Sequence, residues 1–424
     1  MKRLIRNAKI IDPTSPHHGK AIDLFIRDGV IRKLGTHLSE EADDDFDAKG
    51  ACISPGWLDI GTHTGDPGLE HREDLAHVAA AAAAGGYTGL APFPNTRPSV
   101  HSKSEVRYIL QQTQDALVEF LPIGAVSQDC AGKEITEMLD MRAAGAVAFS
   151  DGKQPVEHSG LLLRALLYAK TFDGVILNHP HDMHIIPDGQ MHEGTISTQL
   201  GLKGIPSLSE TLMVQRDLDL LTYSESRLHL YNISSAGSVE LVRAAKERGL
   251  AVTCSVPVIN LLLTDEDLQE FDPNLKVLPP LRTQTDREAL IAGLQDGIID
   301  LITSNHTPLE IEAKQLEFPY AKFGAIGLET AFAVARTALQ DALSLEQLVE
   351  KLAVRPRQIL GIEVPRIKED QKANLTIFDP DLRWNPSRTD FRSKSKNTPF
   401  IGRDLQGKAL VVIRGNQSKI LSDW

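Results

Sequence analysis

The sequence predicts an α/β protein, a (β/α)8 TIM-like barrel joined to a small β-sandwich domain that is formed by both chain ends. Two observations support this expectation. Through the middle of the chain, short apolar runs alternate with helical patterns about eight times, whereas both ends read as strands. The 424 residues are enough for one large barrel and one smaller attachment.

Residues 1–54 are expected to form one part of the β-sandwich. Strand-like runs occur at Leu4-Ile5 and at 9–11, and residues 22–31 alternate apolar and polar around Asp28-Gly29, which is a hairpin pattern. Residues 365–424 are expected to form the other part, with apolar runs at 373–378 and 409–413. We therefore expect the two ends of the chain to meet in one small sheet domain.

Residues 55–364 are expected to form the barrel. Its strand-like runs lie at 56–60, 90–93, 120–123, 147–149, 175–177, 228–231, 251–254 and 299–302. Helical patterns separate most of them, for example at 74–84, 135–144, 159–171 and 238–248. Several of these helical patterns are followed by a glycine (Gly85, Gly145, Gly249), which is a common C-terminal stop.

Composition and charge narrow the class of protein. Hydrophobic residues make up 42% and charged residues 24%, as in globular proteins. The net charge of −12, without a block of Lys or Arg, argues against nucleic acid or an anionic membrane as the main partner. The three cysteines are far apart and form no CxxC pair, and no signal peptide or membrane-spanning stretch is present, so we expect a cytoplasmic protein.

In a barrel of this kind, chemistry takes place at the C-terminal ends of the strands. The segments that follow the predicted strands are 61–63, 94–96, 150–152, 178–179, 232–234 and 304–306. They contain few histidines and several amides. A catalytic zinc usually has at least three His, Cys or carboxylate ligands, so these segments are a poor match to a metal site.

Motifs along nearly the whole chain resemble those of dihydroorotases of the cyclic amidohydrolase superfamily. They include Pro55-Gly56-Trp57-Leu58-Asp59, Asp66-Pro67-Gly68, residues 70–74, 84–88, 94–96, 192–194, 204–206, 235–241, 263–268, 279–282, 323–330 and 391–400. The resemblance implies a role in pyrimidine biosynthesis, where these enzymes interconvert carbamoyl aspartate and dihydroorotate. That reaction needs a metal and a carboxylate that shuttles a proton.

The resemblance also implies six metal-ligand or catalytic positions, of which this chain keeps His63 and His179. The first ligand of the family's His-x-His motif is Gly61, and the bridging carboxylate of its Asp-Asp-Gly segment falls on Gly152. The His of its Cys-His-Leu-Ser segment is Asn232, and the catalytic Asp of its Thr-Asp-His-Ala-Pro-His segment is Asn305. Among the positions that line the family's substrate site, this chain keeps Asn95. Three others are lost, and they are Gly65, Leu278 and Leu309.

Other polar residues near these positions are expected to have no catalytic role. Lys153 adjoins Gly152 and is expected to be a solvated lysine, although related amidohydrolases use a carboxylated lysine. Asp151 adjoins the same position, and an alternative in which it turns into the site stays open. Three histidines are expected on a polar loop (His181, His184, His192), and His306 and Asp59 are expected to support the barrel strands.

The expectation for function is a dihydroorotase-like protein that is catalytically inactive and needs no cofactor. The resemblance to inactive homologues implies a structural or regulatory role, in assembly with aspartate transcarbamoylase, as a homo-oligomer, or both. Two alternatives stay open. The first is an active zinc dihydroorotase with an altered or mononuclear site. The second is a non-catalytic sensor in which Asn95, Asn232 and Asn305 bind a small metabolite.

Overall fold

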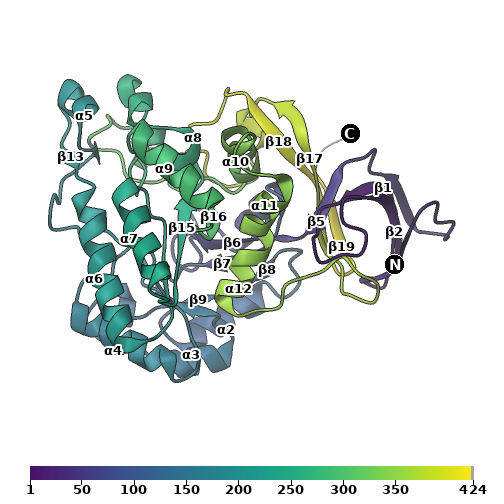
Figure 1. Cartoon of the computed structure of the whole chain (residues 1–424), viewed down its shortest axis with the longest axis horizontal. Helices are drawn as coiled ribbons and strands as arrows, with labels where there is room; N and C mark the ends of the chain where they lie inside the picture. The colour runs from purple at the N-terminus through teal and green to yellow at the C-terminus, as the bar shows by residue number, and fades with distance from the viewer. Residues whose placement is uncertain (422–424) are drawn as a thin grey trace.

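The computed structural model describes residues 1–421, and within them eight parallel strand positions form a closed barrel (Figure 1). The third position is split into two short strands, β8 and β9, on either side of Leu121-Pro122. The barrel strands are β6 (Trp57–Thr62), β7 (Tyr87–Pro92), β8 (Glu119–Phe120), β9 (Ile123–Gly124), β10 (Ala148–Phe149), β11 (Ile176–Asn178), β14 (Leu228–Leu230), β15 (Val252–Pro257) and β16 (Leu301–Thr303). Neighbouring strands pair in parallel from β6 to β8 and from β9 to β16. The ring closes where the backbone N–H of His63 donates to the carbonyl of His306 at 3.1 Å.

Helices surround the strands in Figure 1, as the alternating pattern of the sequence predicts. They are α1 (Leu75–Ala84), α2 (Lys103–Gln112), α3 (Met138–Ala144), α4 (Ser159–Lys170), α5 (Thr195–Leu200), α6 (Leu208–Ser224), α7 (Ala236–Glu247), α8 (Ile259–Leu262), α9 (Gln284–Gln295), α10 (Ala331–Leu339), α11 (Leu345–Val349) and α12 (Arg355–Leu360). A short parallel pair, β12 (Met191–His192) and β13 (Gly204–Ile205), lies outside the ring.

The start of α3 differs from the sequence prediction. The helical pattern begins at Ile135, whereas α3 begins at Met138. Ile135 instead forms a β-bridge with Ser127, and the Thr136 hydroxyl donates to the carbonyl of Ala125 at 2.6 Å. These bonds fix the backbone in an extended conformation, so the helix starts three residues later.

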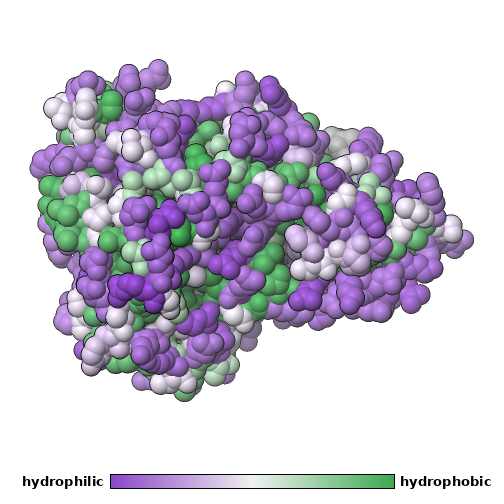
Figure 2. Space-filling view, in the orientation of Figure 1, coloured by the Kyte–Doolittle hydropathy of each residue, from purple (hydrophilic) through white to green (hydrophobic). Residues whose placement is uncertain are grey.

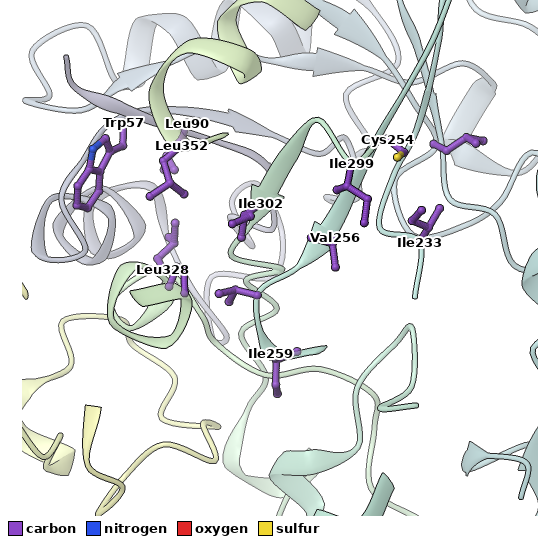
Figure 3. Close-up of a cluster of buried hydrophobic side chains, with 14 of the residues drawn as sticks. Trp57, Leu90, Ile233, Cys254, Val256, Ile259, Ile299, Ile302, Leu328 and Leu352 are labelled. Atoms are coloured by element: carbon purple, nitrogen blue, oxygen red, sulfur yellow. The ribbon is translucent and has the colours of Figure 1, made fainter. Parts of the chain in front are cut away.

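A cluster of buried apolar side chains lies between the barrel strands and the helices (Figure 3). Trp57 at the start of β6 is fully buried, and its ring lies 4.7 Å from Phe332 of α10. It also lies 5.4 Å from Phe378, which belongs to a strand of the second domain. The barrel core therefore continues directly into the interface with the sheet domain.

Both ends of the chain contribute to one eight-stranded sheet, as predicted. Its strands are β1 (Lys2–Ile10), β2 (Ala21–Arg27), β3 (Val30–Gly35), β4 (Asp44–Asp47), β5 (Cys52–Pro55), β17 (Asn374–Trp384), β18 (Leu405–Arg414) and β19 (Gln417–Ile420). The two halves meet where β5 pairs antiparallel with β17, and their apolar side chains share one core. Figure 1 shows this domain on the right of the barrel. The predicted limits between the barrel and the sheet domain, after residues 54 and 364, remain predictions.

The surface is mostly hydrophilic on the face shown in Figure 2, with hydrophobic groups between the polar ones. Large apolar side chains exposed on α6 include Leu208, Leu212 and Tyr223. In residues 1–421, no helix combines the length and the apolar character that crossing a membrane requires.

Candidate functional site

The barrel brings the predicted site positions together at one mouth. Because all the strands run parallel, the segments that follow them meet at the same end. The positions lie within or after six different strands. They are Gly61 within β6, His63 after β6, Asn95 after β7, Gly152 after β10, His179 after β11, Asn232 after β14 and Asn305 after β16. The structure therefore brings these predicted positions to one end of the barrel, and the chemistry possible there depends on their side chains.

His179 presents a bare ring nitrogen. Its Nδ1 lies 3.1 Å from the carbonyl oxygen of Tyr231, and since a carbonyl can only accept, Nδ1 carries the proton. Its Nε2 is buried and has no hydrogen-bond partner in the described part of the chain. Burial lowers the pKa of His179 to about 3, so the imidazole is neutral at pH 7.

His63 presents a second unpartnered nitrogen. Its Nε2 is buried without a hydrogen-bond partner among residues 1–421. Burial, with the charge of Lys153 as the next cause, holds the pKa of His63 well below its usual value. Ring contacts link the two imidazoles through Phe93 and Tyr231. The centroid distances are 5.8 Å from His63 to Phe93, 4.7 Å from Phe93 to Tyr231 and 6.4 Å from Tyr231 to His179.

The first lost ligand position is filled by a neighbouring ring. Gly61 has a φ of +87°, and a Cβ built on it would lie 2.4–2.5 Å from ring atoms of Tyr231. Tyr231 is completely buried, and its hydroxyl donates to the carbonyl of Gly61 at 3.3 Å. In the motif that the family resemblance aligns here, this tyrosine stands at the Cys of Cys-His-Leu-Ser. A large ring thus occupies the space where a ligand side chain would start.

The second lost ligand position is also filled. A Cβ on Gly152, where φ is +68°, would lie 1.7 Å from the side-chain oxygen of Asn95. Asn95 is held there because its Nδ2 donates to the carbonyl of Asp151 at 3.0 Å. At Gly65, where the resemblance places an arginine, a Cβ would lie 2.4 Å from the carbonyl oxygen of Glu73. A side chain at either glycine would require its surroundings to move.

The remaining two lost positions bind each other. The Asn232 amide donates from Nδ2 to Oδ1 of Asn305 at 3.2 Å, and the Asn305 amide donates to the carbonyl of Leu278 at 3.3 Å. Oδ1 of Asn232 accepts from Ser255 and, at 2.7 Å, from Thr303. Both asparagines have positive φ, at 62° and 52°, a conformation that Asn tolerates better than most residues. These amides are therefore committed to the protein itself.

Asp151 does not turn into the mouth. Its Oδ1 accepts from the backbone N–H groups of Val126 and Ser127, each at 2.9 Å, and its Oδ2 accepts from the Ser127 hydroxyl at 2.5 Å. Burial raises the pKa of Asp151 to about 6, and these three bonds oppose the rise. The carboxylate acts as a backbone anchor.

The other histidines lie outside the site or support it. The prediction of a polar loop holds for His184, which is exposed beside Glu157. It is wrong for His181 and His192, which are both buried, and His192 lies in β12 with its Nδ1 3.1 Å from Arg282. His306 accepts from the backbone N–H of Gly327, as expected of a residue that supports a strand end.

Hydrogen bonds hold two further residues that the sequence singled out, Asp59 and Leu309. Asp59 accepts from the backbone and hydroxyl of Ser304 and from Thr62, which ties β6 to the end of β16. Leu309, at a lost substrate-side position, is buried, and its N–H donates to Asn397.

Lys153 corrects a sequence prediction. It was expected to be solvated, but its ammonium donates to the hydroxyl of Thr307 at 2.5 Å. Burial lowers the pKa of this ammonium to about 7. The sequence suggested an exposed lysine because polar residues surround it locally, whereas the fold turns its side chain across the mouth toward the segment after β16.

The side chains at the mouth do not fit the metal centre that the resemblance implies. Among residues 1–421, no three or more His, Cys, Asp or Glu side chains are grouped so that they could hold a metal ion. His63 and His179 supply two neutral donors, and the carboxylate positions are a glycine and an amide. Zinc sites normally have three or four such ligands.

Sequence reasoning missed Tyr231 and Thr307. The signal that could have identified Tyr231 is a pair of opposite changes in side-chain size. Gly61 is smaller than the His of the aligned motif, and Tyr231 is larger than the Cys. Thr307 stands at the Ala of Thr-Asp-His-Ala-Pro-His, and Lys153 at the Gly of Asp-Asp-Gly. The members of each pair, Gly61 with Tyr231 and Lys153 with Thr307, are far apart in the sequence. Their contact is recognised only in the folded barrel.

Comparisons with known proteins agree with the motifs and the fold. The family model described as Dihydro-orotase-like matches residues 50–238. A protein named Dihydroorotase from Syntrophus aciditrophicus (strain SB) is 39% identical over 417 residues, which cover 97% of this chain and 98% of that relative. Another of the same name from Pelotomaculum thermopropionicum is 41% identical over 419 residues, covering 98% of each chain.

Solved structures confirm the predicted barrel. An L-hydantoinase (dihydropyrimidinase) from Arthrobacter aurescens superposes with a TM-score of 0.86 at 25% identity, covering 99% of this chain and 97% of the other. A D-hydantoinase superposes with a TM-score of 0.83 at 21% identity, covering 99% and 95%. The second likeness concerns the fold alone.

Proposed function

Since the chain belongs to the dihydroorotase family, we propose that it is a protein of pyrimidine metabolism whose barrel binds no catalytic metal and does not interconvert carbamoyl aspartate and dihydroorotate. The relatives named Dihydroorotase make this reaction the reference activity. The proposal concerns only the side chains at the mouth of the barrel, since all eight strand positions of the surrounding barrel are formed.

The position of Tyr231 carries the proposal. Its ring lies where a side chain at Gly61 would begin, so the space for the first ligand has been filled as well as its donor lost. Asn95 fills the space at Gly152 in the same way. A side chain restored at Gly61 or Gly152 would therefore require Tyr231 or Asn95 to move.

The chemistry that remains is insufficient for opening or closing a cyclic amide. The reaction needs an activated water or a polarised carbonyl, together with a group that takes up and returns a proton. Asn305 has an amide, which does not titrate near neutral pH, and its oxygen already accepts from Asn232. Burial lowers the pKa of His63 and His179 well below 6.5, so neither ring is an imidazolium that could act as an acid near pH 7. Loss of the acid/base alone costs roughly 10²–10⁴ in rate.

Elemental analysis and an assay on one sample test this proposal. The purified protein is analysed for zinc and other divalent metals, and the same preparation is assayed in both directions, with an active dihydroorotase as reference. We expect less than about 0.1 metal ion per chain and turnover at least ~10⁴-fold below the reference. Stoichiometric zinc with turnover would instead establish the alternative, an active enzyme that uses the bare Nε2 atoms of His63 and His179. A His63→Ala/His179→Ala variant is the matched control, because it should leave the metal content unchanged.

We further propose that the protein has a structural or regulatory role in the cytoplasm and assembles with aspartate transcarbamoylase. The support is the contrast between a fully formed scaffold and a mouth without its catalytic groups. Mixing the two purified proteins from the same organism tests the assembly by sedimentation. A joint boundary and altered transcarbamoylase activity are expected. Independent sedimentation at micromolar concentration would contradict the proposal, and the chain run alone reports its own oligomeric state.

A further inference from the structure

We propose that the mouth of this barrel binds a small molecule that carries a carboxylate, and that the Lys153 ammonium holds that carboxylate. The inference rests on the proposed function, because it takes the mouth to be free of metal. It differs from the sensor that the sequence left open as an alternative, in which Asn95, Asn232 and Asn305 would bind the ligand, since Asn232 and Asn305 are bound to each other.

Lys153 is fixed in the mouth by the segment after β16. Its Nζ donates to Oγ1 of Thr307 at 2.5 Å, and that hydroxyl donates its own hydrogen to the carbonyl of Asn305 at 3.1 Å. The aligned family motifs have Gly and Ala at positions 153 and 307. The cation and the hydroxyl that orients it therefore occur together, in the segments after β10 and β16, which only the barrel brings close.

The Lys153 ammonium has no counter-ion. Among the described residues, no carboxylate oxygen lies within 4.0 Å of it, and Thr307 is the one hydrogen-bond acceptor assigned to its three N–H donors. Lys314, also in this region, differs because its ammonium donates to three backbone carbonyls. A buried charge without a partner is costly, so an arriving anion would gain a strong interaction at Lys153.

Hydrogen-bond acceptors without partners at the mouth indicate which donor groups the ligand carries besides its carboxylate. Oδ1 of Asn95 and Nε2 of His179 are buried and lack hydrogen-bond partners among residues 1–421. The Nδ1 proton of His179 is donated to Tyr231, so its Nε2 can only accept. Oδ1 of Asn95 lies against Gly152, the residue before Lys153, because a Cβ built on that glycine would be 1.7 Å from it. Burial is the main cause that lowers the pKa of His63 and His179, and the charge of Lys153 adds to it at both rings. A ligand with amide N–H groups and a carboxylate matches these atoms.

The ligand class is therefore a small cyclic or open-chain amide with a carboxylate, held without conversion. The Lys153 residue keeps part of its surface accessible, so the ammonium can be reached from the mouth. Its two remaining N–H donors suit the two oxygens of one carboxylate. Lys153 follows Gly152, where the resemblance places a metal ligand, so the mouth has a cation of the chain's own next to that position.

Isothermal titration calorimetry tests the proposal with two probes. L-Dihydroorotate carries the ring amides and the carboxylate, whereas dihydrouracil carries the ring amides alone. We expect the wild-type protein to bind dihydroorotate about 10–100-fold more tightly than dihydrouracil, as for a charged hydrogen bond. Lys153→Met should remove that preference, and it removes a buried unpaired charge, so the fold should tolerate it. Lys20→Met is the matched control, because the same charge is lost from an exposed position of the sheet domain.

The outcomes separate this inference from the proposed function. Equal affinity for the two probes, no binding of dihydroorotate, or unchanged binding by Lys153→Met would overturn the role of Lys153. Each cell is also analysed for carbamoyl aspartate, and its formation would overturn the proposed function instead. A second readout needs no variant: labelling of Lys153 by an amine reagent, followed by mass spectrometry, should slow with dihydroorotate but not with dihydrouracil. Labelling that dihydroorotate leaves unchanged would contradict the inference.

Discussion

Replacing Gly61 with alanine tests whether the ring of Tyr231 really fills the first ligand position. Two costs are expected. The φ of +87° at Gly61 is unfavourable for a residue with a Cβ by about 1–2 kcal/mol. The new Cβ would also lie 2.4–2.5 Å from the Tyr231 ring, and overpacking of this kind costs about 1–3 kcal/mol. The free energy of unfolding should therefore fall by about 2–5 kcal/mol.

Gly249→Ala separates the two costs. Gly249 has nearly the same φ, +80°, but nothing lies within 4 Å of a Cβ built there. Its alanine variant should lose about 1–2 kcal/mol, the backbone cost alone. Urea denaturation followed by tryptophan fluorescence, to which the buried Trp57 at the start of the same strand contributes, compares the two variants.

A double-mutant cycle then identifies the obstructing ring. In the Tyr231→Cys background, Gly61→Ala should cost about 1–3 kcal/mol less than in the wild type, because the overlap is gone. Additive effects, with Gly61→Ala no worse than Gly249→Ala, would refute the reasoning that the ligand position has been filled.

Three further predictions concern the mouth and its support. Asn305→Asp alone should leave dihydroorotase turnover undetected, since the other ligand positions stay lost; a gain of ~10² over wild type in the same assay would contradict this. Asp59→Asn should lower the urea midpoint by an amount equivalent to about 1–3 kcal/mol, because the new amide N–H group must face donors from Ser304 or Thr62; an unchanged midpoint would refute it. The pKa of His179 falls from 6.5 to about 3 on folding, so the stability that the neutral ring contributes is complete above pH 6.5. As the pH falls below 6.5, that stability is lost by up to about 1.4 kcal/mol per pH unit. The free energy of unfolding of His179→Gln should therefore depend less steeply on pH between about 6.5 and 4.5 than that of the wild type, and equal slopes would contradict this.

The fold and the location of the site followed from local patterns. Apolar runs and helical segments alternate because each barrel strand is buried and each helix covers the outside, and parallel strands then bring residues such as Asn95 and His179 to one end. The losses at Gly61 and Asn305 were likewise visible from aligned motifs. The early helical pattern at Ile135 failed because a non-local bridge to Ser127 overrides local helix propensity.

The way in which the mouth repacked could not be predicted. Whether Gly61 is a gap or a filled position depends on Tyr231, which is 170 residues away in the chain. The local surroundings of Lys153 suggest a solvated side chain, and only the closed barrel places Thr307 opposite it. Contacts of this kind depend on how distant strands are positioned, which a single sequence does not specify residue by residue.

Metal content and turnover, measured on one preparation, test the central claim most directly. The purified protein should hold less than about 0.1 zinc ion per chain and should convert neither carbamoyl aspartate nor dihydroorotate at a rate within ~10⁴-fold of an active dihydroorotase. One or two zinc ions per chain, with turnover that disappears in the His63→Ala/His179→Ala variant, would show that the mouth still assembles a working metal centre and would contradict the account.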